Sequence, residues 1–98
     1  MKWLEIIELR SVDRDRVLNE LDLMSLAAEA DPGSRPQEIK IYVHGTVETD
    51  MSVNLIYDSE NADTRGSSLG LRLVSMLKGF GLVNHSVWVE RSKLTDQK

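Results

Sequence analysis

The chain has 98 residues, which is within the usual size of one domain, and no composition break or linker run divides it. Its net charge of −4 opposes the phosphate contacts on which nucleic-acid binding depends, so we expect no nucleic-acid partner. The absence of cysteine excludes disulfides, thiolate catalysis and Cys-ligated metal centres.

The first two expected elements are a strand and a helix. Residues 3–10 are rich in Ile and Leu and too short for a self-sufficient helix, and Ser11 and Asp13 follow as suitable helix caps. From Asp13 to Ala28, apolar residues recur at steps of three and four, with polar residues largely between them. This spacing predicts an amphipathic helix, which the Pro- and Gly-containing residues 31–36 end.

A hairpin, a second helix and a last strand follow. Apolar and polar residues alternate with period two over 38–44 and 52–58, which predicts two strands joined by a turn. After a polar loop, Ser67 or Ser68 can cap a helix whose apolar stripe ends near Gly79. The remaining predicted strand is 83–90.

This order predicts an α+β, ferredoxin-like βαββαβ fold with a four-stranded antiparallel sheet and two helices on one face. Residues 1–91 form the expected domain, and residues 92–98 form a polar tail. No apolar run resembles a signal peptide or a membrane span, so we expect a cytoplasmic protein without membrane contact.

Two helices cover only one face of such a sheet, and successive residues of a strand point alternately to its two faces. The natural core side consists of Ile39, Ile41, Val43, Val53, Leu55, Val87 and Val89. The opposite side consists of Tyr42, His44, Asn54, Ile56, Ser86 and Trp88, with His85 on the helix side. That opposite side is too apolar and aromatic for a plain solvated surface.

The first strand is apolar on both sides. Leu4 and Ile6 share a side with Glu8, whereas Glu5 shares the other side with apolar neighbours. A strand that is apolar on both sides is typical of a covered sheet, so we expect a homodimer through the open face. The expected dimer interface consists of Trp3, Ile7, Leu9, Tyr42, Ile56 and Trp88.

With its apolar and aromatic second sheet face, the βαββαβ pattern over residues 1–91 resembles the dimeric α/β-barrel superfamily, which includes proteins similar to the antibiotic biosynthesis monooxygenases. The resemblance implies that two ferredoxin-like subunits pack sheet to sheet and enclose space for a ligand. No catalytic residue of the superfamily matches a position here, so none is transferred to this chain.

Three functions follow from this pattern. The first is a non-catalytic or ligand-binding homodimer that forms through the open face and could bind a small molecule. The second is a cofactor-free, monooxygenase-like enzyme acting on an apolar substrate, and the third is a regulatory module that binds a metabolite at a subunit boundary. The expected ligand-binding residues are Tyr42, His44, Asn54, Ile56 and Trp88.

The weak catalytic candidates are His44, Asn54 and Glu5, which could converge as base, orienter and ligand contact. In the alternative interpretation, His44 and Asn54 satisfy turn hydrogen bonds, and Glu5 pairs with a basic side chain across an interface. His44 and His85 lack the short spacing of a helical metal pair, so we expect neither a metal site nor a cofactor.

Residues 65–70 lead into the second helix, where free backbone N–H groups can hold an anion. They lack the ending of a phosphate-binding P-loop, so helix capping is the competing interpretation.

Overall fold

The computed structural model describes residues 1–24, 35–92 and 94 of the chain. Within these residues the elements are β1 (Lys2–Arg10), α1 (Arg14–Leu23), β2 (Glu38–Val43), β3 (Asp50–Asp58), α3 (Ser68–Leu77) and β4 (Leu82–Val89). The predicted order of strands and helices is confirmed. The predicted continuation of the first helix to Ala28 lies outside the described residues, as does most of the expected polar tail.

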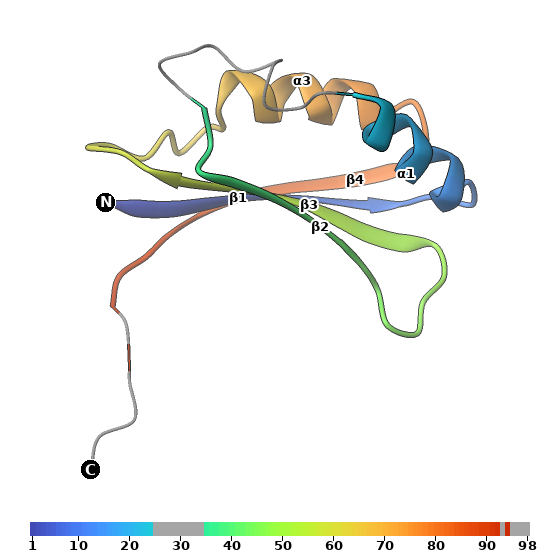
Figure 1. The fold of residues 1–98 in the computed structure, drawn as a ribbon, viewed down its shortest axis with the longest axis horizontal. Helices are drawn as coiled ribbons and strands as arrows, with labels where there is room; N and C mark the ends of the chain where they lie inside the picture. Colours follow the sequence, from blue (N-terminus) through green and yellow to red (C-terminus); the bar gives the residue numbers. More distant parts are fainter. Residues whose placement is uncertain (25–34, 93, 95–98) are drawn as a thin grey trace.

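The four strands form one antiparallel sheet in the order β2-β3-β1-β4. Because β1 is central, it pairs with β3 on one side and with β4 on the other. Both helices lie over the same face of the sheet (Figure 1). The chain is therefore a small α+β fold, and its elements are compatible with a ferredoxin-like arrangement.

The core lies between the sheet and the two helices. Trp3 is aligned with Tyr57 across β1 and β3, and their rings stack with centroids 4.2 Å apart. Four residues further along β1, Ile7 is aligned with Val53 of β3, and both side chains are buried. Burial of each such side chain contributes about 1.5 to 3 kcal/mol. The helices contribute Val17, Leu21, Leu69, Leu73 and Leu77 to this core.

The prediction that Trp3, Ile7 and Leu9 lie on the open face is wrong. All three are at most 5% exposed and pack beneath the helices. Glu5 lies on the same side of β1, and its fully buried carboxylate is hydrogen-bonded to Ser67, the N-cap of α3, and to His85 of β4. The side of β1 turned away from the helices therefore carries Leu4, Ile6 and Glu8 instead.

The two helices begin differently. Ser67, and not Ser68, is the N-cap of α3, since its hydroxyl accepts a hydrogen bond of 3.0 Å from the Gly70 N–H. Asp13 precedes α1 but makes no side-chain capping bond. Instead, the Ser11 hydroxyl accepts from the Asp13 N–H at 3.1 Å and donates to the Phe80 carbonyl at 2.8 Å. Ser11 thus joins the start of α1 to the residues that follow α3.

Candidate functional site

The sheet face turned away from the helices, called the open face below, is apolar at one end. Leu4 of β1 lies between Ile56 of β3 and Trp88 of β4, so an apolar row crosses three strands. The Trp88 side chain is 62% exposed although it donates to the Ser86 hydroxyl at 3.0 Å. The alternation in the sequence predicted this side correctly for Ile56, Ser86 and Trp88.

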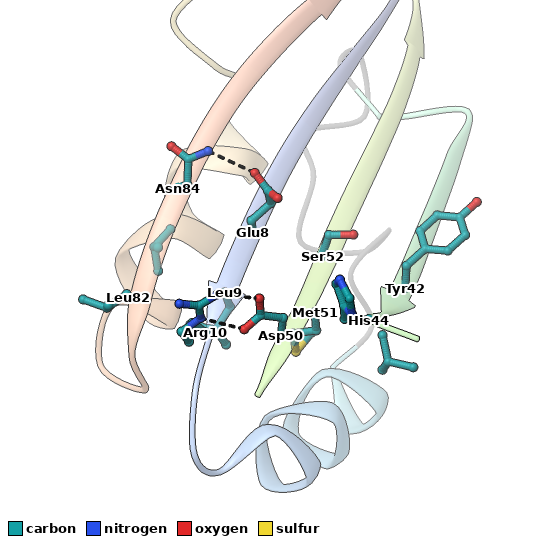
Figure 2. A pocket seen from close by; sticks show the side chains of 12 residues that line it. Glu8, Leu9, Arg10, Tyr42, His44, Asp50, Met51, Ser52, Leu82 and Asn84 are labelled. Atoms are coloured by element: carbon teal, nitrogen blue, oxygen red, sulfur yellow. Dashed lines mark hydrogen bonds and ion pairs between the residues drawn. The ribbon is translucent and has the colours of Figure 1, made fainter. Parts of the chain in front are cut away.

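The other end of the open face is polar. Glu8 of β1 lies between Ser52 of β3 and Asn84 of β4, and the next row places Arg10 beside Asp50. A cleft of about 450 Å³ opens over these rows. Figure 2 shows the side chains around it. The cleft is lined by Glu8, Leu9, Arg10, Tyr42, Val43, His44, Asp50, Met51, Ser52, Leu82, Val83 and Asn84.

An ion pair closes one end of the cleft (Figure 2). Arg10 donates from Nε to Asp50 Oδ1 at 2.8 Å and from Nη2 to Oδ2 at 2.9 Å, which is the bidentate geometry that a guanidinium favours. Thr49 Oγ1 donates to the same carboxylate at 2.9 Å. The hydrogen bond from Arg10 lowers the pKa of Asp50 to about 2, and the same bond raises the pKa of Arg10. These two charges are therefore mutually satisfied.

Glu8 and Ser52 both line the cleft and are cross-strand neighbours, on β1 and β3 respectively (Figure 2). The Oε1 atom of Glu8 accepts a hydrogen bond of 3.0 Å from Asn84 Nδ2. In the described part of the chain, no cation is paired with this carboxylate. Glu8 is thus the uncompensated charge of the cleft.

His44 reaches the cleft from the end of β2, in a fixed tautomer. Its Nδ1 atom accepts from the Thr46 N–H at 3.1 Å and from the Val47 N–H at 2.9 Å. Backbone amides can only donate, so Nδ1 carries no proton and the neutral ring carries its proton on Nε2. The remaining polar atom of His44, which lines the cleft, is therefore the Nε2–H donor. The turn-forming bonds of Nδ1 agree with the alternative interpretation drawn from the sequence.

The three weak catalytic candidates do not converge. Asn54 lies in the middle of β3, where its Nδ2 donates to the Lys40 carbonyl at 3.3 Å and to Ser52 Oγ at 2.9 Å. His44 lies at the hairpin end of the open face. Glu5 lies on the opposite face, under the helices. A catalytic group that combines Glu5 with His44 and Asn54 is therefore excluded by the geometry.

Glu5 belongs to a buried polar cluster at the N-terminus of α3. Its carboxylate accepts from the Ser67 N–H at 3.2 Å and from the Ser67 hydroxyl at 2.6 Å. His85 Nε2 lies 2.6 Å from the other oxygen, and the Tyr57 hydroxyl donates to Ser67 Oγ at 2.7 Å. Burial raises the pKa of the Tyr57 phenol. The anion that this helix terminus holds is the chain's own Glu5 side chain.

Two glycines make room for this cluster. A Cβ atom added to Gly70 would overlap the Glu5 carboxylate. Gly66 has φ of 108°, a backbone conformation that side chains rarely adopt, and a Cβ there would come within 2.6 Å of the His85 ring. The glycines at positions 66 and 70 were thus a signal for close approach to a buried group.

The chemistry of the cluster is structural. The Ser67 hydroxyl donates to Oε1 of Glu5, whereas His85 contacts Oε2, so His85 does not touch the hydroxyl and the cluster contains no Ser–His pair of the kind that activates a nucleophile. The cluster joins β1, β4 and α3. Within the described residues, no three His, Asp or Glu side chains are grouped closely enough to hold a metal ion.

Reasoning from the sequence missed the polar end of the open face. Arg10, Asp50, Glu8 and Asn84 line the cleft, yet each is an ordinary surface residue type at a strand end. The register of β1 against β3 and β4 brings them together, and that register was not available from the sequence.

Comparisons of the chain with protein-family models, with curated proteins and with solved structures each gave no match. Neither helix of the described chain is long and apolar enough to cross a membrane.

Proposed function

We propose that this chain is a homodimer that forms by packing two open faces together and binds a small organic molecule in the cleft at the polar end of that interface. The observation that carries the proposal is a sheet face that neither helix of the described residues covers, with a cleft at one end (Figure 1). Trp88 and Tyr42 are 62% and 55% exposed on this face. The apolar row of Leu4, Ile56 and Trp88 on this face is the kind of surface that is typical of interaction sites.

The open face is large enough for a modest dimer. β1 and β3 each have nine residues. At about 3.3 Å per residue they are about 30 Å long, and four strands about 4.8 Å apart span roughly 15 to 19 Å. Two such faces would bury roughly 1,000 Å² in projection, which is near the lower limit for a specific interface. The expected dimer is therefore reversible and concentration-dependent.

The charges of the open face favour contact between two copies. Lys40 and Arg10 lie on the same face as Glu8, Glu38 and Asp50, so both signs are interspersed. The chain as a whole carries −4. Two copies of an acidic chain repel each other least when they meet through a surface on which positive and negative charges are mixed. The mixed charges therefore favour the open face as the dimer interface.

The size and lining of the cleft favour a ligand. Small-molecule sites are typically about 300 to 1,000 Å³, apolar in part, with a few polar groups that orient the ligand. The cleft has about 450 Å³ and combines Tyr42 and Leu82 with several polar side chains. Because His44 offers a donor in place of a base, the geometry favours binding over the monooxygenase-like alternative.

Light scattering of the wild type and of Ile56→Lys tests the dimer. Ile56 lies in the apolar row of the open face, and a lysine there would bury an unpaired ammonium in the interface. The matched control, Ser75→Lys, adds the same charge at an exposed position of α3.

We expect the wild type and Ser75→Lys to approach twice the chain mass of 11.1 kDa at high micromolar concentration. Ile56→Lys should remain at 11.1 kDa with an unchanged far-ultraviolet circular dichroism spectrum. A folded wild-type monomer throughout the concentration range, or a dimeric Ile56→Lys, would refute the proposal.

A further inference from the structure

We infer that the cleft takes a small amino-acid-like zwitterion, with its ammonium group on Glu8 and its carboxylate toward the Nε2–H group of His44 and the hydroxyl of Ser52. This inference rests on the proposed function, since it names the class of ligand for the same cleft. Three features of the cleft carry it: the positions of its donors and acceptors, its charge balance, and the burial that dimer formation would impose.

The cleft side chains that can still form hydrogen bonds include a negatively charged acceptor and neutral donors, and these lie over different strands. Glu8 and Asn84 lie over β1 and β4, whereas Ser52 and His44 lie on the β2 and β3 side (Figure 2). Glu8 offers the Oε2 atom, which accepts no hydrogen bond from any side chain in the described residues. The negative acceptor on β1 is therefore followed across the sheet by neutral donors, first Ser52 on the neighbouring β3 and then His44 after β2.

The donors are defined by the bonds they already make. His44 Nδ1 is occupied by two backbone N–H groups, so its remaining polar atom is the Nε2–H donor. Ser52 Oγ accepts from Asn54 Nδ2 at 2.9 Å, which leaves the Ser52 hydroxyl proton for a ligand. Both groups suit a carboxylate or carbonyl oxygen. A ligand without such an oxygen would leave them unpaired when water is expelled.

The charge balance requires a cation at Glu8. Arg10 is held by Asp50 through two hydrogen bonds, so it does not neutralise Glu8. When two open faces pack together, the Glu8 carboxylate loses water, and a buried unpaired carboxylate is strongly unfavourable. An ammonium group removes that cost, whereas a purely anionic or apolar ligand does not. Ligand binding should therefore strengthen the dimer.

Chemical-shift perturbation in ¹H–¹⁵N spectra tests the inference, with the standard L-amino acids added singly to the full chain. We expect at least one to shift the amide resonances of Glu8, Ser52 and Thr46. Its N-acetyl derivative, which lacks the ammonium group, and its carboxamide, which lacks the carboxylate, should each bind more weakly. Glu8→Gln should weaken binding about tenfold or more, because a charge-assisted bond is lost.

Glu38→Gln is the matched control, because Glu38 lies on the open face at the apolar end, in register with Ile56. Its affinity for the amino acid should equal that of the wild type. The inference is overturned if no amino acid shifts the cleft resonances at millimolar concentration, or if the N-acetyl derivative binds as well as its parent. Light scattering of the same samples separates the two proposals. A dimer without shifts refutes only the ligand class, and a monomer with cleft shifts refutes only the dimer.

Discussion

Replacement of Glu5 is the sharpest test of how the fold is held together. Its carboxylate is fully buried and accepts hydrogen bonds from Ser67 of the α3 cap and from His85 of β4. Glu5→Ala would leave the Ser67 N–H and the His85 ring without their acceptor and would open a cavity between β1 and α3. Glu5→Gln keeps the volume and one carbonyl acceptor but removes the negative charge.

The expected cost follows from the burial of the group. Removing one partner of a buried, charged hydrogen-bonded pair costs about 3 to 5 kcal/mol. A domain of this length has about 5 to 15 kcal/mol of total stability. At about 4 to 8 °C per kcal/mol, Glu5→Ala should lower Tm by more than about 12 °C. Glu5→Gln should cost less, about 1 to 3 kcal/mol, because Ser67 keeps an acceptor.

Urea unfolding followed by circular dichroism measures these costs directly, and the slope of each transition shows whether the unfolded states are comparable. Glu60→Ala is the control, because Glu60 is an exposed glutamate in the loop after β3 and does not line the cleft. Its loss should change the free energy of unfolding by no more than about 0.5 kcal/mol. If Glu5→Ala were as mild as Glu60→Ala, the buried cluster would not join β1 to α3 and β4 as described.

Two further predictions follow from single contacts. The Asp50 carboxyl should titrate near pH 2 by ¹³C NMR, and Arg10→Gln should return its pKa toward the ordinary value of 3.8. Because the pKa of Asp50 is lower in the folded state, this ion pair stabilises the fold above pH 3.8, and the stabilisation is lost as pH falls through about 2. If the titration midpoint of Asp50 were unchanged in Arg10→Gln, Arg10 would not be the cause of the lowered pKa. Gly70→Ala should cost about 1 to 3 kcal/mol in urea unfolding, since the new methyl group meets the Glu5 carboxylate, whereas Gly45→Ala meets nothing within 4 Å and should be nearly neutral. Equal stability of the two glycine variants would show that the carboxylate is not seated against α3.

Periodicity was sufficient to predict the order of the elements and the faces of β2, β3 and β4. Each of these strands has one side that is clearly more apolar, so parity alone separates Ile41 from Tyr42 and Leu55 from Ile56. The sorting failed for β1, because Glu5 on one side and Glu8 on the other make its two sides look alike. The difference between the two carboxylates lies in their partners.

Those partners are far away in the chain. Glu5 meets Ser67 and His85 only because β1 is next to β4 and α3 begins above them. No local pattern shows that a carboxylate is paired in this way, although the glycines at positions 66 and 70 indicate a close approach. The cleft was missed for a related reason, since its Arg10–Asp50 pair depends on strand register.

The central claim is that the open face is buried between two copies of the chain, and Trp88 reports on it most directly. Trp3→Phe keeps a ring against Tyr57 and leaves Trp88 as the sole indole. In that variant, dilution from high micromolar concentration should move the emission maximum to longer wavelength and increase acrylamide quenching, at the same midpoint as the fall in mass by light scattering. Emission that is water-exposed and freely quenched at every concentration, in a chain that is folded by circular dichroism, would contradict the claim.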